Sequence, residues 1–181
     1  PRAPGLRIRS IGYLAHMGSV LRVAIVEDDK ELRELLRRRV ERAEQMRVVA
    51  SFTSGDDFLE GLNELQVDVV LMDINMPGRN GIECVRAAKS THPSLQFMML
   101  TIFENPAYIF EALCAGATGY LLKSTPAEEL ITAIRDIHKG GSPMNSTIAR
   151  MVVNSFQKET QQRINDEQLS DREKQVLDGL A

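Results

Sequence analysis

The apolar positions of the chain cluster into short runs that have the length of β-strands. Five such runs cover residues 21–26, 47–52, 67–72, 95–100 and 119–122. The run of residues 67–72 is nearly continuous in apolar residues, whereas a strand with one solvated face would alternate with polar ones. This pattern predicts strands buried on both faces, as in a parallel sheet whose two faces are covered.

Between and after these runs, apolar residues recur every three or four positions, which is the spacing of amphipathic helices. The expected helices are residues 31–40, 54–65, 81–88, 106–115 and 126–139. In the first of them, Leu32, Leu35, Leu36 and Val40 recur at helical spacing, and Asp29 can act as the N-cap. Alternating strands and helices predict an α/β fold, and right-handed crossovers favour a doubly wound, five-stranded parallel sheet of order 2-1-3-4-5.

The strand ends carry the residues that suggest chemistry. In an open parallel sheet, ligands bind beyond the carboxyl ends of the strands. The residues predicted at these ends are Glu27, Asp28, Asp73, Thr101 and Lys123. Taken singly, each has an ordinary structural explanation, such as a turn, a helix cap or a solvated lysine. Their joint presence at the ends of four strands favours one shared site.

Three acids at one sheet edge repel one another, and a divalent cation removes that cost. Mg²⁺ prefers oxygen ligands, so we expect it to be bound by Glu27, Asp28, Asp73 and the backbone carbonyl of Asn75, with Mn²⁺ as the alternative ion. This arrangement suits phosphoryl transfer to a carboxylate. Asp73 would be the nucleophile. The Lys123 ammonium and the Thr101 hydroxyl would each contact a phosphoryl oxygen.

Four segments together resemble the receiver domain of response regulators. They are VEDD at residues 26–29, DINMPGRNG at 73–81, MLT at 99–101 and GYLLK at 119–123. The resemblance implies a CheY-like fold, a phosphoacceptor at Asp73 and a sensor histidine kinase as partner. It also implies a switch in which Thr101 moves towards the phosphoryl group and Tyr120 turns inward. Such a protein catalyses its own phosphorylation and slow dephosphorylation rather than acting as a conventional enzyme.

The sequence departs from that family in two places. Ser124 follows the lysine where many receivers have proline, and the bulky Ile102 follows Thr101 where a small residue is common. A large side chain at position 102 would hinder movement of Thr101 or Tyr120.

The C-terminal part resembles the NarL/FixJ family, whose output domain is a LuxR-type helix-turn-helix. LSDREKQVL at residues 169–177 has a capping box, Ser170 with Glu173, before an apolar stretch. The expected organisation is a cloning remnant at 1–18, a receiver domain at 19–141, a helical linker at 142–168 and the first helix of a truncated DNA-binding domain at 169–181. DNA binding is therefore expected of a full-length protein, because the helix that reads the major groove is absent here.

Composition agrees with a globular cytoplasmic protein. The chain has 181 residues, 43% hydrophobic and 26% charged, with a net charge of −3 and no apolar run long enough to span a membrane. Cys84 and Cys114 both fall in predicted helices without metal-ligand spacing, which is typical of reduced thiols. We also expect phosphorylation to change self-association, as a homodimer, or contact with the output segment.

Three alternatives stay open at this point. The chain could be a receiver that relays phosphate or docks a protein without a DNA output. A Mg²⁺-dependent phosphatase is disfavoured, because Asn75 stands two residues after Asp73 where such enzymes usually have a second acid. A nucleotide-binding flavodoxin-like protein is weaker still, because no glycine-rich loop follows the first strand.

Overall fold

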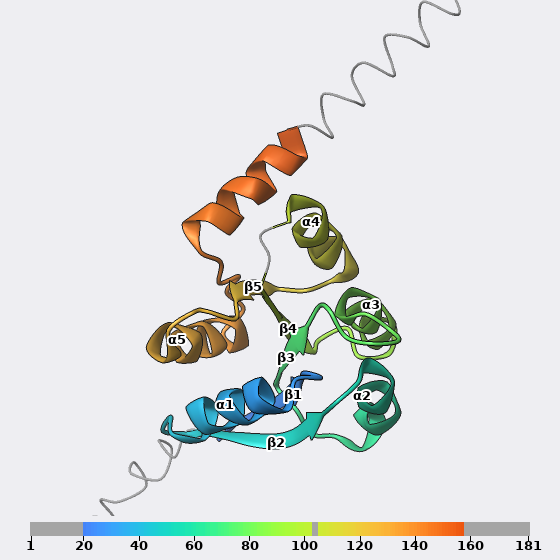
Figure 1. Cartoon of the computed structure of the whole chain (residues 1–181), viewed down its shortest axis with the longest axis vertical. Helices are drawn as coiled ribbons and strands as arrows, with labels where there is room; N and C mark the ends of the chain where they lie inside the picture. The colour runs from blue at the N-terminus through green and yellow to red at the C-terminus, as the bar shows by residue number, and fades with distance from the viewer. Residues whose placement is uncertain (1–19, 103–104, 158–181) are drawn as a thin grey trace, which may run out of the picture.

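The computed structural model describes residues 20–102 and 105–157, which form an α/β domain around one parallel sheet (Figure 1). The strands are β1 (Leu21–Val26), β2 (Met46–Phe52), β3 (Val69–Asp73), β4 (Gln96–Thr101) and β5 (Gly119–Leu122). They are arranged in the order β2-β1-β3-β4-β5, and every pairing is parallel. The predicted fold class and strand order are confirmed.

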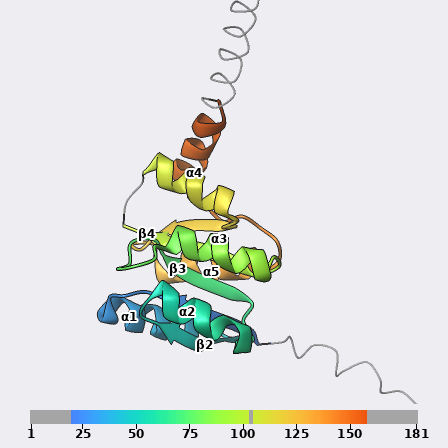
Figure 2. The ribbon, with the colours of Figure 1, turned by 90° about the vertical axis from the view of Figure 1, so that its right-hand side faces the viewer.

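Helices cover both faces of the sheet. They are α1 (Lys30–Glu41), α2 (Gly55–Gly61) with the short 3₁₀ helix η1 (Leu62–Glu64), α3 (Gly81–Thr91), α4 (Pro106–Ala115) and α5 (Ala127–His138). Two cores result, one under α1 and α5 and the other under α2, α3 and α4. Figures 1 and 2 show the two helical layers with the sheet between them. Successive strand residues feed alternate cores, which explains why the central strand β3 is apolar from Val69 to Met72.

Several element boundaries differ from the predictions. β3 begins at Val69, because Asp68 before it binds the side chain of Arg22 in a bidentate ion pair at 2.8 Å. The predicted helix of residues 54–65 ends its α-helical part at Gly61 and tightens into η1. α3 extends three residues beyond its predicted end, to Thr91.

One apolar position of the first predicted helix is exposed. Leu35 is 44% exposed, whereas Leu36 is buried. Neighbouring helical residues point about 100° apart, so the narrow buried face of α1 accommodates Leu36 and Val40 but not Leu35. Leu35 instead lines the acidic cleft described below.

The predicted linker begins with a helix that belongs to the domain core. Residues 146–157 are helical and lie beside α4 in both ribbon views (orange to red in Figures 1 and 2). Ile148 is fully buried. The rings of Phe156 and Phe110 are arranged edge to face, with their centroids 5.6 Å apart. Just before this helix, Met144 forms an isolated parallel bridge with Tyr120, whose amide donates to the Pro143 carbonyl at 3.0 Å.

The predictions for residues 1–18 and 169–181 lie outside the described residues, so the cloning remnant and the helix-turn-helix segment stay predictions. Across the part of the chain that the structure describes, no helix has both the length and the apolar character needed to cross a bilayer.

Candidate functional site

The carboxyl ends of β1, β3 and β5 open into an acidic cleft of about 1020 Å³ that α1 borders on one side. Oxygen atoms of Glu27, Asp28 and Asp73 all lie within 4.8 Å of one another there. Glu27 and Asp73 are 1% and 2% exposed, whereas Asp28 is exposed. The three predicted acids are therefore brought together at one end of the sheet.

Lys123 joins the two buried acids. Its ammonium lies 2.8 Å from Glu27 Oε2 and 2.9 Å from Asp73 Oδ2, and its side chain is 12% exposed. Burial raises the pKa of both carboxyl groups above their usual range, and the contact with Lys123 opposes that rise. Burial lowers the pKa of Lys123, but its bonds to Glu27 and Asp73 outweigh this, so its pKa is raised. One ammonium thus partly compensates three carboxylates.

A tightly built turn holds Asp73 at the end of β3. Every residue of β3 is buried, which fixes the strand. Gly78 has a φ of +79°, a conformation that side chains disfavour. At Gly81 the backbone approaches the Asp73 carbonyl so closely that an added Cβ would overlap that oxygen. Asn80 and Glu83 then form a capping box that starts α3.

The donor set of the cleft fits a hard divalent cation. Asp73 Oδ1 is buried and receives no hydrogen bond of regular geometry from the described residues. Asn75 is exposed and lines the cleft, and its amide lies close enough to help lower the pKa of Asp73. Three clustered carboxylates, of which only Glu27 and Asp73 pair with the Lys123 ammonium among the described residues, match the oxygen ligands that Mg²⁺ prefers. The Asn75 carbonyl remains a predicted ligand.

Thr101 and Tyr120 lie behind the cleft. Thr101 ends β4 and is 2% exposed, and Tyr120 in β5 is fully buried. Burial raises the pKa of Tyr120 to about 12, and the Thr101 hydroxyl weakly opposes this. In this structure the tyrosine ring is inside the domain, next to the predicted switch threonine. The neighbouring Ile102 is 64% exposed and lines the cleft mouth, so it does not fill the space around Thr101.

Sequence reasoning missed Arg33. Its Nη1 donates to the backbone carbonyls of Glu27 at 2.6 Å and Asp28 at 3.1 Å. Within the arginine-rich sequence of α1 it looks like a solvated residue. The only signal was its position on the first turns of α1, immediately after the acidic pair.

The chain is similar in sequence to a known protein family. The family described as the response regulator receiver domain matches residues 23–135. The transcriptional regulatory protein LnrK of Bacillus subtilis is 35% identical over 142 residues, which are 78% of this chain and 64% of that protein. The uncharacterized transcriptional regulatory protein YxjL of the same organism is 34% identical, with 89% of this chain and 75% of that protein covered. The chain thus spans only part of the length of these relatives.

Solved structures give the same assignment. A two-component response regulator of the LuxR family from Aurantimonas sp. SI85-9A1 matches with a TM-score of 0.71 and 31% identity, over 76% of this chain and 98% of that one. The isolated receiver domain of RcsB from Salmonella enterica serovar Typhimurium matches with a TM-score of 0.67 and 27% identity, over 73% and 98%. The chain belongs to the response regulator receiver domain family, and its relatives are transcriptional regulators of the NarL/LuxR type.

Proposed function

We propose that this chain accepts a phosphoryl group on Asp73 from a sensor histidine kinase and thereby controls a transcriptional output. The observation that carries the proposal is the buried Asp73 carboxylate, held 2.9 Å from Lys123 within a cluster of three acids. A carboxylate in this setting is a nucleophile next to a fixed positive charge. Membership of the receiver family supports the same reaction and a location in the cytoplasm, where such a kinase presents its phosphohistidine.

In the proposed transfer, an oxygen of Asp73 attacks phosphorus and the phosphorus–nitrogen bond of the phosphohistidine breaks. The histidine nitrogen keeps the bonding electron pair and takes up a proton. Lys123 and the Thr101 hydroxyl bind phosphoryl oxygens. Glu27, Asp28, Asp73 and the Asn75 carbonyl would hold Mg²⁺, or Mn²⁺ in its place. When bound, the cation would neutralise the negative charge of the carboxylates and the phosphoryl group at this edge of the sheet. Hydrolysis of the product at the same residues would reset the protein slowly.

The switch would run from Thr101 to Tyr120 and then to the linker. A phosphoryl group adds about −1.5 to −2 charges close to Thr101. Tyr120 lies next to Thr101 and is bonded through its amide to Pro143. A change at Thr101 therefore has a continuous route of contacts to the helix of residues 146–157.

The proposed output is binding of DNA by a longer protein that includes the rest of the helix-turn-helix domain. Homologous structures support this, because RcsB has been solved as two dimers bound to DNA. We also propose a phosphorylation-dependent homodimer through the face formed by α4, β5 and α5. The alternative is a receiver that relays phosphate or docks a protein without a DNA output. A full-length protein that has no specific DNA affinity after phosphorylation would favour that alternative.

The phosphoacceptor can be tested with a small phosphodonor. We expect the chain, with Mg²⁺ and acetyl phosphate, to gain one phosphoryl group in an acid-stable, base-labile bond, measured by intact mass. Asp73→Asn should gain none. The matched control is Asp56→Asn, because Asp56 is an exposed acid paired with Arg79 outside the cleft. Equal phosphorylation of Asp73→Asn and wild type would contradict the proposal, and so would no phosphorylation of the wild type with either acetyl phosphate or a cognate kinase.

A further inference from the structure

Arg33 holds the acidic loop from behind the cleft. It lies on α1, where its amide donates to the Asp29 carbonyl at 2.9 Å. Its side chain turns back to the end of β1 and donates from one nitrogen, Nη1, to the carbonyls of Glu27 and Asp28. Arg33 is half-buried and is not among the residues that line the cleft. The guanidinium therefore touches the backbone of the two acids and not their carboxylates.

The two acids differ in how their side chains are fixed. Glu27 is buried, and its Oε1 accepts from Lys123 at 2.9 Å and from the Asp29 amide at 3.4 Å. Asp28 is exposed, and among the described residues none donates a hydrogen bond to its carboxylate. The backbone of Asp28 therefore sets the point from which its side chain projects into the cleft. Within residues 20–102 and 105–157, Arg33 is the residue whose side chain donates to this backbone.

We propose that Arg33 is a positioning residue for the divalent cation, acting through the backbone of Glu27 and Asp28. The inference rests on the cation site of the proposed function. Hydrogen bonds from a charged donor are stronger than neutral ones, so two of them restrict this loop substantially. A ligand whose direction is fixed before the cation arrives loses less freedom on binding.

Two effects of removing Arg33 oppose each other, and their sizes decide the expected result. Loss of positioning by a residue outside the ligand set weakens cation binding about tenfold. Loss of one positive charge near the site strengthens binding, by about twofold at an ionic strength that screens the repulsion between Arg33 and the cation. We therefore expect a net weakening of about fivefold.

The donor geometry provides a conservative rescue. Because a single nitrogen serves both carbonyls, a lysine ammonium with its three donors can replace it and keeps the charge. Arg33→Lys should therefore bind cation nearly as well as wild type. Arg33→Met keeps much of the length and loses the donors. Arg37→Met is the matched control, because Arg37 lies on the same helix and, among the described residues, its side chain bonds to Glu34 and Glu41 and not to the acidic loop.

The experiment is a Mn²⁺ titration of the whole chain, with free Mn²⁺ measured by electron paramagnetic resonance. We expect Arg33→Met to raise the dissociation constant about fivefold. Arg37→Met should change it by less than about twofold. If Arg33→Met does not fold, Arg33→Gln, which is too short to reach both carbonyls, replaces it with the same expectation. The proposal would be overturned if folded Arg33→Met, or Arg33→Gln in its place, bound Mn²⁺ as tightly as the wild type. It would also be overturned if Arg33→Lys bound Mn²⁺ as weakly as that variant.

A double-mutant cycle separates positioning from general stability. Because Arg33 acts through Asp28, Arg33→Met should cost less affinity in an Asp28→Asn background than in the wild type. An equal cost in both backgrounds, or a lowered melting temperature with unchanged Mn²⁺ affinity, contradicts the role of Arg33. Failure of the wild type to bind Mn²⁺ would contradict the proposed site itself. If the wild type binds Mn²⁺ and the Arg33 variants bind it equally well, only the role of Arg33 is contradicted.

Discussion

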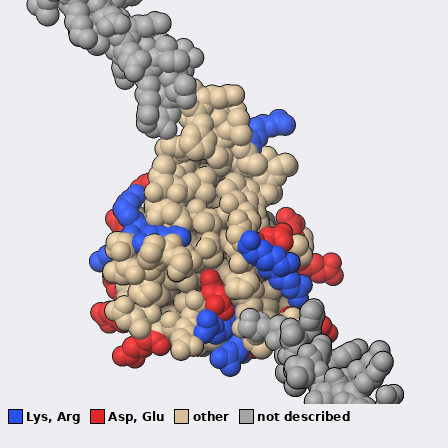
Figure 3. All heavy atoms as spheres, turned by 180° about the vertical axis from the view of Figure 1, so that it is seen from behind, with Lys and Arg blue, Asp and Glu red and all other residues tan. Residues whose placement is uncertain are grey.

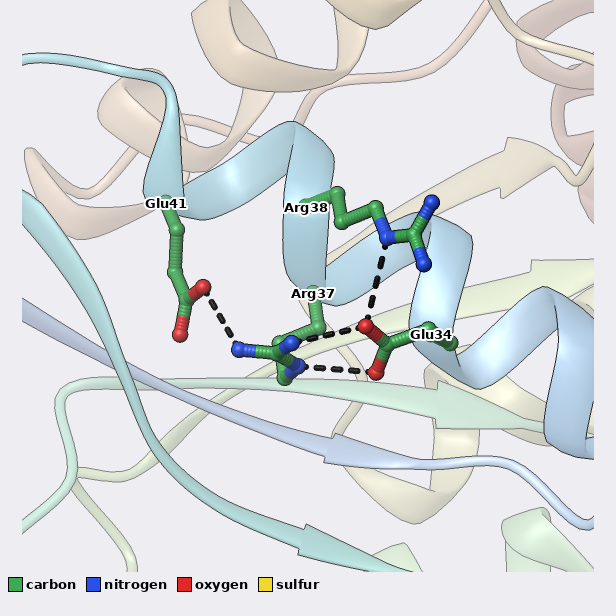
Figure 4. Close-up of polar contacts among 4 residues, drawn as sticks. All are labelled: Glu34, Arg37, Arg38 and Glu41. Atoms are coloured by element: carbon green, nitrogen blue, oxygen red, sulfur yellow. Dashed lines mark hydrogen bonds and ion pairs between the residues drawn. The ribbon is translucent and has the colours of Figure 1, made fainter.

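Two charged clusters lie close together in this domain, one in the cleft and one on the outer face of α1. In the cleft, Lys123 lies 2.8 and 2.9 Å from Glu27 and Asp73. On α1, Arg37 binds Glu34 and Glu41, each at 2.7 Å (Figure 4). The contact distances are therefore nearly the same. What differs is solvent exposure. The side chains of Glu27 and Asp73 are 1% and 2% exposed, whereas those of the cluster around Arg37 on α1 are 39–41% exposed.

The pKa shifts of the two clusters run in opposite directions. Burial raises the pKa of Glu27 and of Asp73 despite their bonds to Lys123. The hydrogen bond from Arg37, with a smaller contribution from Arg38, lowers the pKa of Glu34 to about 2. A nearby positive charge thus stabilises the ionised form of an exposed carboxylate. For a buried carboxylate it does not fully compensate for the loss of hydration. The comparison indicates that the cleft is costly to the fold and available for a cation, whereas the α1 cluster is already satisfied.

The charges on the face seen in Figure 3 are mixed in sign. Figure 3 shows acidic and basic side chains along the sides and lower part of the described surface, around a largely uncharged middle. The single-sign acidic cluster of the cleft is therefore a local feature and not a reflection of the net charge of −3.

The largest expected effect is that of removing the ammonium from the cleft. Lys123→Met leaves the buried acids Glu27 and Asp73 without the ammonium that they share, next to the exposed Asp28. We expect the free energy of unfolding, measured with urea in the absence of divalent cations, to fall by about 3–5 kcal/mol. Lys139→Met, at the exposed end of α5, is the control and should have little effect. A loss of less than about 1 kcal/mol would mean that the buried acids are better solvated than their burial indicates.

The second largest effect is an expected increase in the free energy of unfolding. Asp73→Asn removes one of three crowded acids and leaves Glu27 to pair with Lys123. We expect the free energy of unfolding to rise by about 1–2 kcal/mol at neutral pH, although the variant cannot be phosphorylated. Asp56→Asn, which removes an exposed acid, serves again as the control. Destabilisation of Asp73→Asn would show that the bond to Lys123 outweighs the cost of burying the charge.

The rise in the free energy of unfolding of Asp73→Asn should depend on pH. The pKa of Asp73 is raised in the folded state, so between its ordinary and its raised pKa the folded wild type binds more protons than the unfolded chain. Wild-type stability therefore declines as pH rises through this window, and asparagine does not titrate. The advantage of Asp73→Asn should be small below about pH 4 and should increase to a plateau at higher pH. Urea midpoints over a pH series measure this, and a pH-independent difference would contradict it.

The smallest effect is expected on α1. Glu34→Gln removes a carboxylate whose pKa is lowered, so its contribution is present above the ordinary carboxyl pKa and is lost as pH falls through about 2. Because this cluster is exposed, we expect only a slight fall in melting temperature at neutral pH, abolished by 1 M salt. A large, salt-independent fall would mean that the cluster has a structural role beyond its ion pairs.

Much of the fold was predictable because its determinants are local. Short, mainly apolar runs marked the strands, and the bounds of α4 and β5 agree with the predictions. The candidate site was predictable for a topological reason, since parallel strands direct their carboxyl ends to one edge. Glu27, Asp73 and Lys123 therefore meet although they are far apart in the sequence.

What could not be predicted depends on contacts between elements. The exposure of Leu35 depends on how narrow a face α1 buries against the sheet. The reach of Arg33 to two carbonyls depends on the angle between α1 and β1, which no periodicity reveals. The pairing of Met144 with Tyr120 joins two segments across α5 and its turn. In each case the residue type is ordinary and its surroundings determine what it does.

The Tyr120–Met144 bridge has a further consequence for the behaviour of the protein in concentrated solution. β5 is an edge strand of the sheet, and open edges are templates for pairing with other chains. The bridge and the Tyr120–Pro143 hydrogen bond occupy part of that edge. A chain shortened to end at Gly141 would expose backbone donors and acceptors there, together with the apolar surface that Ile148 now covers. Such a version should aggregate more readily than the longer chain.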